Sequence, residues 1–173
     1  GRGSDRRSAL TTAPVASADT IFVIDSAQVV RAFDVSTGAR RWVVELDSGN
    51  SRDKLAIGSG LAIDGERLIV ASAFGFLTAL DISNGQELWR TDTEAPMIGS
   101  PAVSDNRIFV ASNNNETIAL NSATGEILWS DQAIAETARV LGSPSPAAAD
   151  DIVIAPYSSG EIIAYLAPNG RRL

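Results

Sequence analysis

The sequence predicts an all-β fold, a β-propeller made of about four four-stranded blades. Two observations support this prediction. A motif of fixed spacing returns along the chain at intervals of 40 to 47 residues, and strand-like runs precede each copy. One period of this length accommodates a four-stranded antiparallel blade with its turns. Propellers typically have roughly 4 to 8 blades, so four such units make about half of a large ring.

The recurring motif reads Ala-x-Asp-x-x-x-Gly-x-x-x-Trp, with Asn or Leu in place of Asp in later copies. Its glycines are Gly38, Gly85, Gly125 and Gly170, and its tryptophans are Trp42, Trp89 and Trp129. The fourth tryptophan would be residue 174, one position beyond Leu173, so we interpret the end of the chain as a cut through a repeat. We expect one partial propeller, residues 1–173, with units at approximately 12–46, 59–93, 100–133 and 143–173.

Strand and turn signals recur inside each unit. In the second unit, runs rich in β-branched and aliphatic residues cover 61–63, 67–71 and 76–80, and they are separated by Asp64-Gly65 and Phe74-Gly75. Runs of this kind, bounded by turn residues, indicate strands joined by hairpins. No segment holds a helical period for long, so almost no helix is expected.

The motif also has a mechanical interpretation. Asp34 and Asp81 can accept hydrogen bonds from backbone N–H groups two or three residues further on, and each motif glycine can supply a positive φ. This predicts a tight turn between the third and fourth strands. Each tryptophan carries a large apolar surface toward the next blade. We therefore expect Trp89 and its equivalents to be buried between blades, as structural residues and not as a ligand cage.

Composition restricts the chemistry. The chain is 45% hydrophobic and 20% charged, which is typical of a globular domain, and its net charge of −7 opposes binding to nucleic acid or anionic lipid. It contains no Cys and no His, so thiolate nucleophiles, imidazole bases and Cys/His metal sites are absent from these residues. The carboxylates fall mostly at turns and on outer strands. We expect no catalytic residue, no metal and no cofactor.

Length variation points to a binding face. The links from each tryptophan to the next unit differ in length, while the units themselves are nearly constant. In an up-and-down blade these links share a face with the turns between second and third strands, and loops on a rigid scaffold commonly carry binding function. The link 131–142 is the least polar of the long ones. It is predicted either to form a short helical turn that meets a partner or to cover the blade beneath it.

The motif resembles the PQQ-like propeller repeat, and the resemblance covers nearly the whole chain. Quinoprotein dehydrogenases carry similar repeats around a quinone and a calcium ion, so one alternative function is a fragment of such an enzyme. In that family a pair of adjacent cysteines commonly lies by the quinone, and this chain has none. A ligand-sensing periplasmic propeller is a further alternative.

More specific segments resemble the outer-membrane assembly lipoproteins called BamB, in their alphaproteobacterial form. The segments are Leu10-Thr11-Thr12-Ala13-Pro14-Val15, Ile134-Ala135-Glu136-Thr137 with Leu141-Gly142, and Ile154-Ala155-Pro156-Tyr157-Ser158-Ser159-Gly160-Glu161. The resemblance implies a non-enzymatic, eight-bladed scaffold at the periplasmic face of the outer membrane. It also implies that the membrane is reached only through a lipid anchor on a cysteine outside these residues.

The same resemblance implies the partners. BamB proteins bind the periplasmic domains of the barrel-inserting protein BamA through a loop with the pattern Leu-x-Leu-Arg-Gly. The corresponding stretch is Ala138-Arg139-Val140-Leu141-Gly142, which keeps the glycine, the aliphatic character and one arginine. Arg139, Val140 and Leu141 are the expected partner-binding residues. Unfolded outer-membrane proteins are a second expected partner, and nucleic acid is not.

Overall fold

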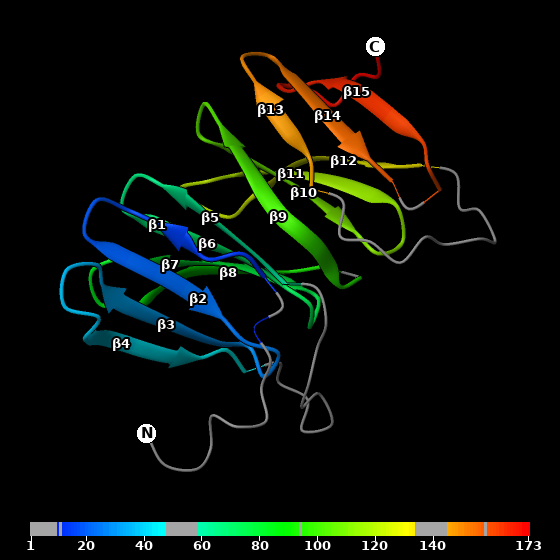
Figure 1. Cartoon of the computed structure of the whole chain (residues 1–173). Helices are drawn as coiled ribbons and strands as arrows, with labels where there is room; N and C mark the ends of the chain where they lie inside the picture. The colour runs from blue at the N-terminus through cyan, green and yellow to red at the C-terminus, as the bar shows by residue number, and fades with distance from the viewer. Residues whose placement is uncertain (1–9, 11, 48–58, 94, 134–144, 158) are drawn as a thin grey trace.

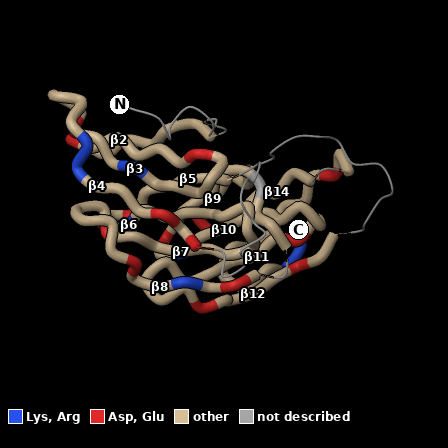
Figure 2. The backbone as a smooth tube through the Cα atoms, turned by 90° about the horizontal axis from the view of Figure 1, so that it is seen from below, with Lys and Arg blue, Asp and Glu red and all other residues tan. Residues whose placement is uncertain are grey.

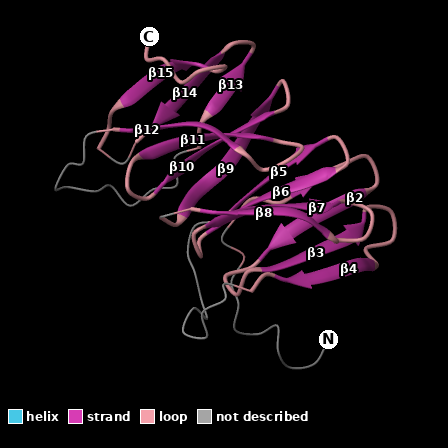
Figure 3. Cartoon of the chain, turned by 180° about the vertical axis from the view of Figure 1, so that it is seen from behind, coloured by secondary structure: helices cyan, strands magenta, loops and turns pink. Residues whose placement is uncertain are grey.

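The computed structural model describes residues 10, 12–47, 59–93, 95–133, 145–157 and 159–173, and these form strands and turns without any helix (Figures 1 and 3). Among the described residues there is accordingly no helix long and apolar enough to cross a bilayer. This confirms the all-β class that the repeat spacing predicts.

The strands form four antiparallel sheets in chain order. The first contains β1 (Val15–Ala16), β2 (Thr20–Ile24), β3 (Val29–Asp34) and β4 (Arg40–Glu45). The second contains β5 (Gly60–Asp64), β6 (Arg67–Ser72), β7 (Phe76–Asp81) and β8 (Glu87–Asp92). The third contains β9 (Met97–Ser104), β10 (Arg107–Ser112), β11 (Glu116–Asn121) and β12 (Ile127–Gln132). The fourth contains β13 (Ala147–Ala149), β14 (Ile152–Pro156) and β15 (Ile162–Leu166).

The fourth sheet differs from the prediction of four strands in every unit. It has three strands in the described residues, and an isolated bridge between Tyr165 and Arg172 stands where the other sheets continue into a fourth strand. The third sheet also starts earlier than expected, since β9 begins at Met97 instead of Ser100. The described residues thus form three four-stranded blades followed by a three-stranded one.

The four sheets lie side by side in chain order (Figure 1). The core consists of three apolar clusters, one at each junction between neighbouring blades. Phe22 of β2 lies in the first cluster, Ile69 of β6 in the second and Phe109 of β10 in the third, and all three are fully buried. The hydrophobic burial that stabilises this fold is therefore mostly burial between blades.

The turn of each motif has the predicted structure. The Asp34 carboxylate accepts hydrogen bonds from the backbone N–H groups of Ser36 at 3.0 Å and Thr37 at 2.9 Å. Asp81 accepts one from Ser83 at 2.7 Å. These bonds satisfy amides that the turn removes from the strand ladder, which explains the aspartate at this position.

Each motif tryptophan is attached to the following blade. Its indole N–H donates to the backbone carbonyl just after the next motif's Asp position, from Trp42 to Ile82 at 3.0 Å, from Trp89 to Ser122 at 3.0 Å and from Trp129 to Ala167 at 2.8 Å. In all three blades a β-bulge lies beside the tryptophan, and a bulge redirects side chains on the bulged strand. The same contact therefore repeats at every junction.

The motif glycine accommodates this indole. A Cβ added at Gly85, Gly125 or Gly170 would lie 2.8, 2.5 or 2.6 Å from a ring carbon of Trp42, Trp89 or Trp129. These glycines also have φ of +78°, +73° and +70°, a conformation that other L-residues rarely adopt. The turn and the junction both require glycine here.

The tryptophans are less buried than expected. Trp42 is 9% exposed, but Trp89 and Trp129 are only half-buried. They lie on β8 and β12, the outermost strands of their sheets, and each ring contacts the motif glycine of the next blade. Trp89 is therefore a half-buried contact residue and not a core residue.

Two glycine substitutions separate turn strain from loss of the indole contact. Gly38 has φ +69°, but a Cβ there would meet no described atom within 4 Å. Gly38→Ala should lower the free energy of unfolding by about 1–2 kcal/mol, the cost of left-handed backbone. Gly125→Ala should cost about 1–3 kcal/mol more, because the methyl overlaps Trp89. Urea unfolding of both variants measures this difference, and equal losses would contradict the proposed indole contact.

Candidate functional site

The sequence-predicted contact residues Arg139, Val140 and Leu141 lie outside the described residues. The link that carries them leaves the blade at the end of β12, where Asp131, Gln132 and Ala133 are described. The structure therefore shows how the link starts.

The start of the link is fixed by the turn between β10 and β11. The backbone N–H of Ala133 donates to the Asn115 carbonyl at 2.9 Å, and the Gln132 side chain donates to the Asn114 carbonyl at 2.6 Å. The same kind of bond recurs in the second blade, where the N–H of Thr93 donates to Gly75 at 2.8 Å. Each link therefore starts beside the second-to-third-strand turn of its own blade, as the up-and-down order predicts.

Residues of the fourth blade also bind the start of the link, at Asp131. Asp131 accepts hydrogen bonds from Arg172 Nη2 at 2.6 Å and Nε at 2.9 Å, and from the Tyr165 hydroxyl at 2.8 Å. Arg172 Nη2 also donates to the Gln132 carbonyl at 3.0 Å. Two charge-assisted bonds from one guanidinium give this contact a defined orientation.

A buried polar chain continues from Asp131 into the junction between blades three and four. The hydroxyl of Tyr165 lies 2.5 Å from that of Tyr157, which in turn lies 2.6 Å from Thr117 Oγ1. Tyr165 and Thr117 are fully buried and Tyr157 is 5% exposed. Burial raises the pKa of both tyrosines, so their hydroxyls remain protonated donors. The hydroxyls of Tyr165, Tyr157 and Thr117 therefore all have partners, as buried polar groups require.

Sequence reasoning missed this chain of hydroxyls. In the sheet register Tyr165 occupies the place of Leu80 and Leu120, and Tyr157 that of Ser112. Two tyrosines at positions that are smaller or apolar in the other units were a readable signal. What the sequence could not indicate is that the Tyr157 hydroxyl bonds that of Tyr165, which in turn donates to Asp131.

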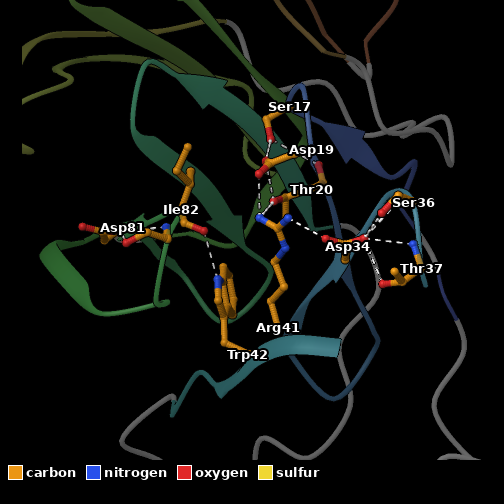
Figure 4. Close-up of polar contacts among 11 residues, drawn as sticks. Ser17, Asp19, Thr20, Asp34, Ser36, Thr37, Arg41, Trp42, Asp81 and Ile82 are labelled. Atoms are coloured by element: carbon orange, nitrogen blue, oxygen red, sulfur yellow. Dashed lines mark hydrogen bonds and ion pairs between the residues drawn. The ribbon is translucent and has the colours of Figure 1, made fainter. Parts of the chain in front are cut away.

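A second polar site is a pocket of about 280 Å³ between blades one and two, on the face opposite the links. It is lined by Asp19, Thr20, Arg41, Glu66, Asp81, Ile82 and Ser83. Figure 4 shows Arg41 beside Trp42, with its guanidinium between Asp19 and Asp34. The third and second units have leucine in the place of Arg41, so this pocket is particular to the first junction.

Arg41 is held by its own blade. Its Nη1 donates to Asp19 at 2.8 Å and to the Thr20 hydroxyl at 2.8 Å, and its Nη2 donates to Asp34 at 2.6 Å. The Arg41 guanidinium, aided by the hydroxyl and N–H groups of the turn, lowers the pKa of Asp34 well below its ordinary value. It lowers the pKa of Asp19 in the same way. The negative charges of Asp19 and Asp34 thus balance the positive charge of the Arg41 guanidinium.

Charge elsewhere is dispersed. Figure 2 shows acidic positions spread over the turns of the successive blades, with fewer basic ones between them. Among the described residues, no three His, Cys, Asp or Glu side chains are grouped so that they could hold a metal ion. The polar sites of this part of the chain are therefore hydrogen-bonded structural networks and one small pocket.

Comparison with known proteins decides the family. The sequence model described as "Outer membrane protein assembly factor BamB" matches residues 26–173. The chain belongs to the BamB family. It is 25% identical over 162 residues to BamB of Yersinia pestis. An uncharacterized protein of Rickettsia conorii is 31% identical over 165 residues. The alignment with the Rickettsia protein covers 95% of this chain and 39% of that relative. The alignment with Yersinia BamB covers 91% of this chain and 41% of that protein.

Solved structures share the fold. BamB from Moraxella catarrhalis matches with a TM-score of 0.77 at 22% identity, over 94% of this chain and 51% of that one. The designed protein Ika4 matches with a TM-score of 0.74 at 15% identity, over 93% and 92%. Quinohemoprotein alcohol dehydrogenase from Comamonas testosteroni matches with a TM-score of 0.71 at 17% identity, over 95% of this chain and 34% of that one. The BamB scaffold and the dehydrogenase scaffold are thus one architecture at this level of similarity.

The coupling between Arg41 and Asp34 can be measured by NMR titration of the carboxyl groups. Arg41→Leu, which installs the residue of the second and third units, should raise the Asp34 pKa toward its ordinary value of 3.8 and leave the Asp81 pKa unchanged. A lowered folded-state pKa stabilises the fold above the unfolded-state pKa and loses that contribution as pH falls. The stability difference between wild type and variant should therefore be largest above pH 3.8 and shrink below it. An unchanged Asp34 pKa would contradict the ion pair.

Proposed function

We propose that this chain is a non-enzymatic adaptor in the assembly of outer-membrane proteins, acting at the periplasmic face of the outer membrane. The single observation that carries the proposal is the family match over residues 26–173, which covers every repeat unit except the start of the first. Relatives whose names record this role, such as BamB of Yersinia pestis, align over nearly the whole chain. The chain spans about 40% of these relatives, so the proposal concerns the part that these blades play.

The proposed partner is BamA, through its periplasmic domains. Arg139, Val140 and Leu141 are the proposed contact residues, with unfolded outer-membrane proteins as a second class of partner. An arginine beside aliphatic residues suits an interface, because it forms charge-assisted hydrogen bonds while its neighbours lose water-exposed apolar area. In this proposal the membrane is reached through a lipid anchor that lies outside these residues.

The fixed start of the link supports this choice of site. Asp131 is held by Arg172 and Tyr165, and Ala133 by the turn of its own blade. A loop that leaves a rigid scaffold at a fixed point loses less conformational entropy on binding than a free one. A partner that contacts the link therefore meets a loop whose first residues, Asp131 and Ala133, are already held by hydrogen bonds.

The dehydrogenase alternative rests on likeness of fold alone, since the matched enzyme is 17% identical. The chain has neither cysteine nor histidine to contribute to such a site. The pocket beside Arg41 is the feature that a ligand-sensing function would use, but Arg41 is already bound to Asp19 and Thr20 of its lining. The adaptor role is the better-supported proposal.

Binding to BamA provides the test. Arg139→Glu and Leu141→Ala should each weaken binding of this chain to the periplasmic domains of BamA by about 1–2 kcal/mol, the usual range for interface contacts. Calorimetric titration measures the affinity, and thermal unfolding of each variant shows whether the fold persists.

Matched controls lie on outer strands away from the links. Arg40→Glu and Leu128→Ala change the same residue types at exposed positions and should leave the affinity unchanged. If the folded Arg139 and Leu141 variants bind as tightly as wild type, the link is not the contact site. If Leu141→Ala lowers the melting temperature without a loss of affinity, the link covers its blade instead.

A further inference from the structure

The second and third blades each carry a row of three side chains at the end of the sheet where the motif turn lies. The row joins the last residue of the first strand, the first residue of the second and the last residue of the third, and we call it the end row. It reads Asp64–Arg67–Asp81 in the second blade and Ser104–Arg107–Asn121 in the third. Direct cross-strand neighbours have Cβ atoms roughly 4.5–5.5 Å apart, so the three side chains of a row can interact.

In the first two blades the guanidinium at this end of the sheet has carboxylates of its own blade. Arg67 stands between two aspartates in the register, and its Nη1 lies 3.4 Å from Asp64 Oδ2. The first blade has Thr20 in the arginine position, and there Arg41 donates to both Thr20 and Asp34. A guanidinium has only donors, so these carboxylates supply the acceptors that it needs. Neither blade requires a group from outside.

In the third blade both carboxylates are replaced. Ser104 stands in the place of Asp64, and Asn121 in the place of Asp81. No described carboxylate forms an ion pair with Arg107. Its Nη1 is shielded from solvent and has no hydrogen-bond partner among the described residues. A shielded charged donor without an acceptor is unfavourable, because it has lost water and gained nothing in return.

The two neighbours of Arg107 add further donors. Asn121 Oδ1 already accepts the backbone N–H groups of Ala123 at 2.9 Å and Thr124 at 3.2 Å, so the side-chain NH2 group is what remains to bind a ligand. The hydroxyl of Ser104 can also donate. All three residues of the row are half-buried, so the row borders solvent. The third blade therefore presents a positive charge and three kinds of donor where the second blade has a closed ion pair.

We propose that Ser104, Arg107 and Asn121 form a binding site for a carboxylate group that comes from another molecule. This carboxylate takes the place that the aspartates fill beside Arg67. A carboxylate suits the site because its two oxygens match the parallel N–H groups of a guanidinium, and the amide and hydroxyl then bind the remaining lone pairs. Its source is either a small free acid or an acidic side chain of another protein, and the chemistry is the same for both.

Titration with acetate at neutral pH tests the proposal. Acetate replaces chloride at constant ionic strength, and NMR of the ¹⁵N-labelled protein follows the side-chain N–H signals of Arg107 and Asn121. Both signals should shift and reach saturation, because acetate accepts hydrogen bonds from both groups. Signals that do not move would overturn the proposal. Equal, saturable shifts when chloride replaces a bulky anion would overturn it too, because the site would then bind any anion.

Two variants test the row itself, with the Asn121 amide as the signal. Ser104→Asp rebuilds the pair of the second blade, and Arg107→Ile installs Ile152, the residue of the fourth blade at this position. Each should weaken acetate binding by about tenfold or more, the loss expected for a charge-assisted hydrogen bond. The control Arg40→Ile removes an exposed arginine of β4 and should bind like wild type. The backbone amide spectrum shows that each variant is folded, and wild-type affinity in folded Ser104→Asp would refute the site.

A capped tripeptide with a central glutamate distinguishes the two sources of the carboxylate. Tighter binding of the peptide than of acetate assigns the site to an acidic side chain of another protein, and equal or weaker binding assigns it to a small free acid. In both cases Ser104→Asp should weaken the peptide and acetate alike. A peptide that binds this variant as tightly as wild type would contradict the proposal. BamA is absent from these experiments, so their outcome is independent of the adaptor role.

Discussion

The contact on which this structure depends is the one between each motif tryptophan and the next blade. An indole stacks on a glycine that has no Cβ, and its N–H donates to a carbonyl of the same turn. A four-stranded blade cannot bury both of its faces alone, so a repeat protein is stable only when neighbouring units are joined in register. The tryptophan fixes this register at the outermost strand of each blade, while the apolar clusters fill the space between the sheets.

The same geometry separates scaffold from binding surface. The turn of the motif lies on one face with the Arg41 pocket, and the links leave from the other, where second-to-third-strand turns hold their first residues. Variation in the links therefore changes the surface without altering the junctions. Two links are also anchored by polar groups of the following blade, one at Asp131 by Tyr165 and the other at the Asp47 carbonyl by Arg90.

Much of the fold could be predicted from the sequence because the motif encodes local chemistry. The aspartate and the glycine specify a local turn, and the recurrence of the tryptophan predicts its contact with the next blade; the structure has both. The half-exposure of Trp89 was not predictable in the same way, because Trp42 has the same place in the motif and is 9% exposed. The polar chain through Tyr157 and Tyr165 requires side chains from two blades to converge, and spacing alone does not indicate convergence. The contact residues Arg139 to Leu141 remain a prediction from resemblance.

The most direct test of the tryptophan contact is hydrogen exchange of the three indole N–H groups. With three tryptophans in the chain, a ¹⁵N-labelled sample gives three indole signals, one for each junction. The structure predicts that all three exchange much more slowly than a free indole, because each N–H is bonded to a backbone carbonyl of the next blade. Exchange of Trp89 and Trp129 at the rate of free indole would show that the rim contacts are open in solution, and would contradict their role in joining the blades.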